Sequence, residues 1–100
     1  MIIRVFRARI KPGCVEAFER LVREQSIPWL EQSEGMEGYL PGKPLAETDR
    51  QFTMITMWRN IDCLIRFAGP DWANPVVTAD EEPLVEAMFA DHYERFGRDE

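Results

Sequence analysis

Apolar residues alternate with polar ones, or run together, in segments that favour β-strands. Residues 2–10 are rich in β-branched and aromatic side chains and contain no glycine or proline. Residues 36–40 form a shorter segment, and residues 51–58 carry apolar side chains at both odd and even positions. A strand with two apolar faces is typical of the interior of a sheet that is covered on both sides. We therefore expect three strands here, with 51–58 in the interior of the sheet.

The spacing of apolar residues changes to three and four in two other segments, as in amphipathic helices. The first runs from Cys14 to about Gln32. Pro28 lacks an amide hydrogen, so it should either kink this helix or start a second short one. The second helix is predicted after Asn60, a good N-cap residue, and should stop at Gly69.

The last segment, from Leu84 to Phe96, is expected to become a strand from about Phe89 onward. The predicted order is then β-α-β-β-α-β in a single domain that spans residues 1–100. This order is typical of the α+β ferredoxin-like fold, in which a four-stranded antiparallel sheet carries its helices on one face.

The other face of such a sheet has no cover within one chain. If Phe6 and Trp58 face the helices, strand alternation places five other residues on the open face. These residues are Ile3, Val5, Thr53, Ile55 and Met57. An exposed apolar face of this kind predicts a partner, and a second copy of the chain is the simplest one. We therefore expect a homodimer.

Composition and charge argue against several classes of protein. The chain has 18 acidic and 12 basic residues, a net charge of −6, which argues against a nucleic-acid-binding protein. No apolar run approaches the length of about 18 residues that a membrane span needs. The N-terminal residues lack the long apolar stretch of a signal peptide. We expect a cytoplasmic protein with no membrane partner, in which Cys14 and Cys63 stay reduced.

Several short motifs occur in a defined order from Met1 to about Phe96. They are Arg4-Val5-Phe6-Arg7 ahead of Lys11-Pro12-Gly13, then Thr56-Met57-Trp58, Phe67-Ala68-Gly69 and Asp91-His92-Tyr93-Glu94. In this order and spacing they resemble the antibiotic biosynthesis monooxygenase-like family of dimeric α+β barrels. The resemblance implies two ferredoxin-like halves that pack sheet to sheet as a homodimer. Some members of that family oxidise aromatic polyketides with molecular oxygen and without metal or flavin. Others degrade haem, and many small members have no established activity.

The haem-degrading branch of the family carries an Asn on the first strand, a Trp late in the second helix and a haem-ligating His farther on. Phe6, Phe67 and Val77 stand at these three positions in this sequence. Phenylalanine cannot hydrogen-bond a bound oxygen species, and valine cannot ligate iron. The resemblance therefore does not extend to haem degradation.

His92 is the one histidine in the chain and the candidate catalytic residue. A cofactor-free oxygenase must deprotonate a phenolic substrate, and imidazole exchanges protons near neutral pH. His92 could alternatively be a structural residue, paired with Asp91 or with a backbone carbonyl.

Five aromatic residues could stack on a planar ligand, although each could instead serve core packing. They are Phe6, Trp58, Phe67, Trp72 and Tyr93. Arg4 shares the strand face of Phe6 and could hold a ligand anion or pair with an acidic residue. The acidic run 80–82 is expected to be a solvated loop without a catalytic role.

Two functions remain open at this point. The protein could be a small monooxygenase that uses molecular oxygen on an aromatic, polyketide-like molecule. It could alternatively be a non-catalytic dimeric barrel that binds a small apolar ligand. No phosphate-binding glycine loop, cysteine cluster or set of histidines occurs in the sequence, so we expect no bound cofactor, metal or flavin.

Overall fold

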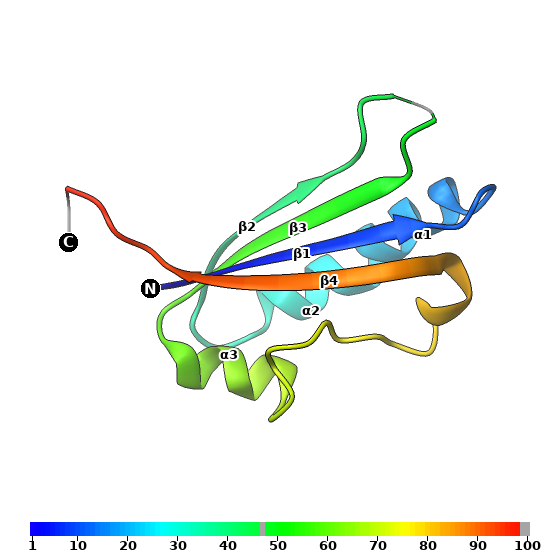
Figure 1. Cartoon of the computed structure of the whole chain (residues 1–100). Coiled ribbons are helices and arrows are strands. Elements are labelled where there is room, and N and C mark those ends of the chain that lie inside the picture. Colours follow the sequence, from blue (N-terminus) through cyan, green and yellow to red (C-terminus); the bar gives the residue numbers. More distant parts are fainter. Residues whose placement is uncertain (47, 99–100) are drawn as a thin grey trace.

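Four antiparallel strands form one sheet in the computed structural model, which describes residues 1–46 and 48–98 (Figure 1). The sheet order is β2-β3-β1-β4. The strands are β1 (Ile2–Ile10), β2 (Met36–Gly42), β3 (Gln51–Trp58) and β4 (Val85–Glu94). With its helices on one face of the sheet, the chain has the α+β ferredoxin-like fold that the order of its elements predicts.

The first helical region is divided into three pieces. These are α1 (Val15–Leu21), the π-helical turn η1 (Val22–Ser26) and α2 (Ile27–Glu31). Pro28 lies in the first turn of α2, where a missing amide hydrogen leaves no helical hydrogen bond unmade. Of the two alternatives, Pro28 therefore starts a second short helix.

The second helix, α3 (Ile61–Ala68), has the ends that the sequence predicts. The side chain of Asn60 accepts a hydrogen bond of 3.0 Å from the amide of Cys63. Gly69 ends the helix with a φ of +88°, a backbone conformation that suits glycine. A short 3₁₀ turn, η2 (Glu82–Leu84), leads into β4.

The predicted start of the last strand is wrong by four residues, because β4 begins at Val85 and not at Phe89. β1 is the reason. Its nine residues pair along their whole length with β4, and the pairing of Ile10 with Val85 closes the ladder after a register shift. Backbone groups of β1 would otherwise lack partners at its end, so pairing extends β4 beyond its own strongly apolar part.

Two clusters of buried side chains hold the helices against the sheet. One contains Ala8, Ile10, Phe18 and Phe52, and the other contains Leu30, Trp58, Cys63 and Leu64. Phe52 and Trp58 lie near opposite ends of β3. The middle of the helix-facing side of the sheet therefore lies between two separate cores.

The opposite face of the sheet is open, as the strand alternation predicts. The register of β1 and β3 places Val5 next to Ile55 and Ile3 next to Met57 on this face. Large apolar side chains on it are exposed, with Leu40 at 59%, Phe89 at 43% and Tyr93 at 54%. Within the described ranges, none of the helices is long and apolar enough to cross a membrane.

Candidate functional site

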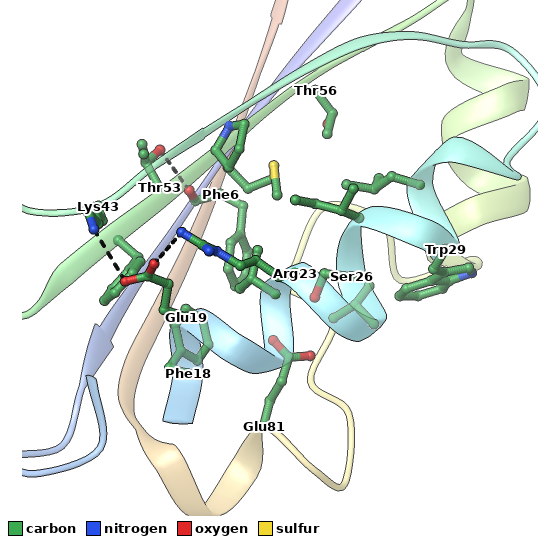
Figure 2. A pocket seen from close by; sticks show the side chains of 18 of the residues that line it. Phe6, Phe18, Glu19, Arg23, Ser26, Trp29, Lys43, Thr53, Thr56 and Glu81 are labelled. Atoms are coloured by element: carbon green, nitrogen blue, oxygen red, sulfur yellow. Dashed lines mark hydrogen bonds and ion pairs between the residues drawn. The ribbon is translucent and has the colours of Figure 1, made fainter. Parts of the chain in front are cut away.

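A cavity of about 320 Å³ lies between the helices and the middle of the sheet (Figure 2). Side chains of β1 and β3 form part of its wall, among them Arg4, Phe6, Met54 and Thr56. The opposite wall comes from α1, η1 and α2. A volume of this size is at the lower end of the range for sites that bind small molecules.

Aromatic rings line much of this cavity. The rings belong to Phe6, Phe18, Trp29, Phe52 and Phe67. The ring centroids of Trp29 and Phe67 are 4.3 Å apart, and those of Phe67 and Trp58 are 4.9 Å apart. The two rings of each pair are tilted by 35° and 36°, and rings packed at these separations make a rigid apolar wall that suits a planar ligand.

The structure brings only part of the predicted aromatic set to the cavity. Phe6 and Phe67 line it, whereas Trp58 is fully buried behind Phe67 and donates from Nε1 to Oγ1 of Thr56 at 2.9 Å. Tyr93 pairs with Ile3 and therefore lies on the open face of the sheet, away from the cavity. Trp72 does not line the cavity either, but it contacts two residues of the site.

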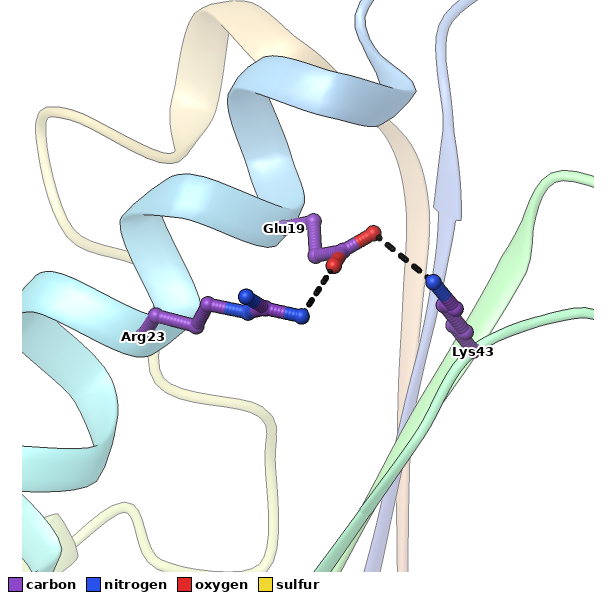
Figure 3. Close-up of polar contacts among 3 residues, drawn as sticks. All are labelled: Glu19, Arg23 and Lys43. Carbon is purple, nitrogen blue, oxygen red and sulfur yellow. Dashed lines mark hydrogen bonds and ion pairs between the residues drawn. The ribbon is translucent and has the colours of Figure 1, made fainter.

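Three charged residues at the cavity connect the helices to the segment that follows β2 (Figure 3). The carboxylate of Glu19 on α1 accepts a hydrogen bond of 2.6 Å from Arg23 and one of 3.5 Å from Lys43. Exposed ion pairs of this kind contribute little to stability. These two ion pairs therefore add little to the stability of the fold.

Arg4 is a buried cation, only 4% exposed, with neutral partners. Its Nη1 donates to the carbonyl of Trp72 at 2.7 Å, and its Nη2 donates to the carbonyl of Asn74 at 3.3 Å. None of the ion pairs in residues 1–46 and 48–98 includes Arg4. Burial lowers the pKa of Arg4, although a guanidinium stays protonated at neutral pH. The site therefore contains a positive charge that no carboxylate neutralises.

His92 lies next to Arg4 and is not part of the cavity wall. Its Nε2 is 2.9 Å from Nη1 of Arg4. Since arginine can only donate, Nε2 must accept, and the imidazole is neutral with its proton on Nδ1. Burial, followed by the charge of Arg4, lowers the pKa of His92, while Asp91 acts in the opposite direction. The ring of Trp72 packs edge-on against His92 at 5.0 Å.

The expectation of a solvated acidic loop is wrong for Glu81, which is only 7% exposed and lines the cavity. Burial raises the pKa of its carboxyl group, against two hydrogen bonds with Thr78 that lower it. Its neighbours Asp80 and Glu82 are exposed as expected. Composition of the loop could not show this difference, but the Thr78-x-x-Glu81 spacing of a capping box could have singled out Glu81.

Comparison with models of protein families shows to which family this chain belongs. The model of the family described as antibiotic biosynthesis monooxygenase matches residues 1–70. The chain belongs to this family. No curated protein sequence matches the chain.

Solved structures share the fold at low sequence identity. PA3566 from Pseudomonas aeruginosa is 21% identical, with a TM-score of 0.74 over 96% of this chain and 94% of that one. A Nitrosomonas europaea protein assigned to the antibiotic biosynthesis monooxygenases is 12% identical, with a TM-score of 0.77 over 97% of this chain and 100% of that one. A MhuD variant with two manganese protoporphyrin IX molecules per active site is 16% identical, with a TM-score of 0.71 over 98% of this chain and 97% of that one.

The residues of this chain do not fit a haem-type group. The cavity wall contains no histidine, and the Nε2 of His92 is already occupied by Arg4. Val77 is half exposed and has no atom that could bind a metal. Across residues 1–46 and 48–98, no three His, Cys, Asp or Glu side chains group together as a metal site would require.

Proposed function

We propose that this protein is a monooxygenase that oxidises an aromatic, polyketide-like small molecule with molecular oxygen and without a bound cofactor. The observation that carries the proposal is the cavity of about 320 Å³ with aromatic walls and the unneutralised cation of Arg4. Membership in the antibiotic biosynthesis monooxygenase family supports the reaction class.

The reaction needs no external reductant when the substrate supplies the electrons. A phenol that has lost its proton is electron-rich enough to reduce oxygen. One oxygen atom then replaces two hydrogens on the ring system, and the other leaves as water. Arg4 would stabilise the phenolate, because its guanidinium has five N–H donors and the described residues use three of them.

Oxygen consumption with a reduced anthrone-like phenol tests this proposal. We expect one molecule of oxygen to be consumed for each molecule of substrate, with one labelled atom from isotopic oxygen in the product. Ile27→Trp should fill the cavity and reduce turnover at least tenfold, whereas Arg20→Trp, an exposed change outside the cavity, should not. A protein that binds the phenol but returns it unchanged would be a binding module and not an oxygenase.

We further propose that the active form is a homodimer joined through the open face of the sheet. Leu40, Phe89 and Tyr93 are exposed there. Arg7 and Asp91 form an ion pair on the same face. Among the described residues, Nε of Arg7 is the one buried side-chain nitrogen or oxygen without a hydrogen-bond partner. A second copy packed on this face would cover the apolar residues and could supply an acceptor to Arg7.

For His92 we propose a role in holding Arg4 and not contact with the ligand. His92→Gln should then change turnover less than tenfold, because the amide oxygen of glutamine can also accept from Arg4. If His92 is instead the base that the sequence suggested, turnover should fall about 10²-fold or more.

The same variant should change how stability depends on pH. The lowered pKa of His92 means that the unfolded chain binds a proton more readily than the native one. Wild type should therefore lose stability as pH falls below about 6.5, the usual histidine value, and His92→Gln should lack this part of the loss. Urea denaturation at several pH values measures it, and identical pH dependence in both proteins would contradict the assignment.

A further inference from the structure

Glu81 lies between the main cavity and a second hollow. The second hollow has a volume of about 230 Å³, and Leu21, Gln25 and Thr78 contribute to its wall. Ser26, Trp29 and Glu81 line both spaces. Figure 2 shows the side chain of Glu81 directed toward the helical segment that carries Ser26. A carboxyl group in this position can exchange protons with both spaces.

The structural role of Glu81 uses only part of the hydrogen-bonding capacity of its carboxylate. Oε1 of Glu81 accepts from the amide of Thr78 at 3.3 Å, and Oγ1 of Thr78 accepts from the amide of Glu81 at 3.2 Å. This reciprocal pair is a capping box. The side chain of Thr78 also forms a hydrogen bond with the carboxyl group. An ionised carboxylate has about four acceptor sites, so these contacts leave part of it available to a ligand.

The charges around Glu81 do not neutralise it. The other charged residues of the cavity wall are Arg4, Glu19, Arg23 and Lys43. Arg23 and Lys43 both bind Glu19, and Arg4 binds two carbonyl groups and His92. On its own segment, Asp80 and Glu82 are exposed and add negative charge. A buried carboxylate without a cation has an increased affinity for a proton.

We propose that Glu81 is the proton acceptor of the cavity, which removes the hydroxyl proton of the ligand. This assignment rests on the proposed function. In the step, the O–H bond of the phenol breaks and its electron pair stays on the phenolate oxygen, near the cation of Arg4. The proton forms a new O–H bond with a carboxylate oxygen of Glu81. After oxygen has reacted, the two hydrogens lost from the ring system leave in the water that is formed. Glu81 returns its proton to the phenolate oxygen of the product, and the second hollow lets the carboxyl group exchange this proton with solvent.

Proton removal can be measured without oxygen chemistry. The planar probe 5-nitrobenzisoxazole loses a ring C–H proton to a base, its N–O bond breaks, and a coloured cyanophenolate results. We expect wild-type protein to catalyse this elimination with a rate that rises as Glu81 ionises, with a midpoint above about 4.3, the usual glutamate value. Glu81→Gln should reduce the rate at least tenfold and remove the pH dependence.

Glu81→Gln is a suitable variant because glutamine also forms a capping box, so the fold should persist. Glu82→Gln is the matched control, since it removes the same charge from the exposed neighbouring residue. Its elimination rate should equal that of wild type. As a second measurement, Glu81→Ala should recover activity when acetate is added, because acetate can take the place of the missing carboxylate.

The outcomes separate the two proposals. Equal elimination rates in wild type and Glu81→Gln would overturn the assignment of Glu81. A loss of elimination in Glu81→Gln, together with no oxygen consumption by wild type, would support Glu81 as the base and reject the oxygenase. If both proposals hold, Glu81→Gln should also reduce oxygen consumption about 10²-fold, and the loss should shrink as pH approaches the pKa of the phenol.

Discussion

Ile55→Asp is expected to abolish the proposed homodimer. Ile55 lies in the middle of β3 on the open face, between Val5 on β1 and Leu40 on β2. A dimer joined through this face would bury about 1,600 Å² or more, as stable interfaces do. An aspartate at its centre would be a buried charge without a partner, which costs several kcal/mol.

Light scattering at micromolar concentration measures the result. Wild type should have twice the mass of one chain, and Ile55→Asp should have the mass of one chain or precipitate. Leu45→Asp is the matched control, because Leu45 has the same size as Ile55 and is also apolar. Leu45 is, however, fully exposed in the segment after β2. It should leave the dimer intact. A folded wild-type monomer at this concentration would contradict the proposal.

Local sequence patterns were sufficient for most of the fold. β3 has the predicted bounds because apolar residues fill both of its faces and polar residues flank it. The bounds of α3 follow from the side-chain cap of Asn60 and the positive φ of Gly69. The start of β4 could not be predicted in this way. It is determined by pairing with β1 rather than by the residues of β4 themselves.

The site was less predictable, since it depends on contacts between distant segments. In the sequence, Trp29 is one apolar position of a predicted helix. Its contact with the ring of Phe67 is visible only in the folded structure. Two partners of Arg4 are backbone carbonyls about 70 residues away, which no side-chain pattern indicates. Tyr93 is a different case. Strand alternation alone places it on the face opposite to His92, and the structure has it there.

Gly35→Ala adds a single methyl group and is expected to cause a large fall in the free energy of unfolding. Gly35 is buried, with a φ of +79°, a conformation that costs other residues about 1 kcal/mol or more. An added Cβ would lie 2.3 Å from Sγ of Cys63 and 2.7 Å from its Cβ. Overpacking of this kind costs about 1–3 kcal/mol or more. We therefore expect a loss of about 3 kcal/mol or more in the free energy of unfolding.

Gly13→Ala separates the two contributions, because Gly13 has a similar φ of +82° but nothing within 4 Å of an added Cβ. In urea denaturation, Gly13→Ala should lower the free energy of unfolding by only about 1 kcal/mol. Equal losses in the two variants would show that contact with Cys63 does not destabilise Gly35→Ala.

The carbonyl of Gly35 also accepts a hydrogen bond of 2.8 Å from the amide of Arg59, just before α3. Cys63 and Phe67 belong to the same helix, so a shift of α3 that relieves the clash would also move the ring that lines the cavity. Gly35→Ala should therefore weaken binding of a planar phenol as well, whereas Gly13→Ala should not.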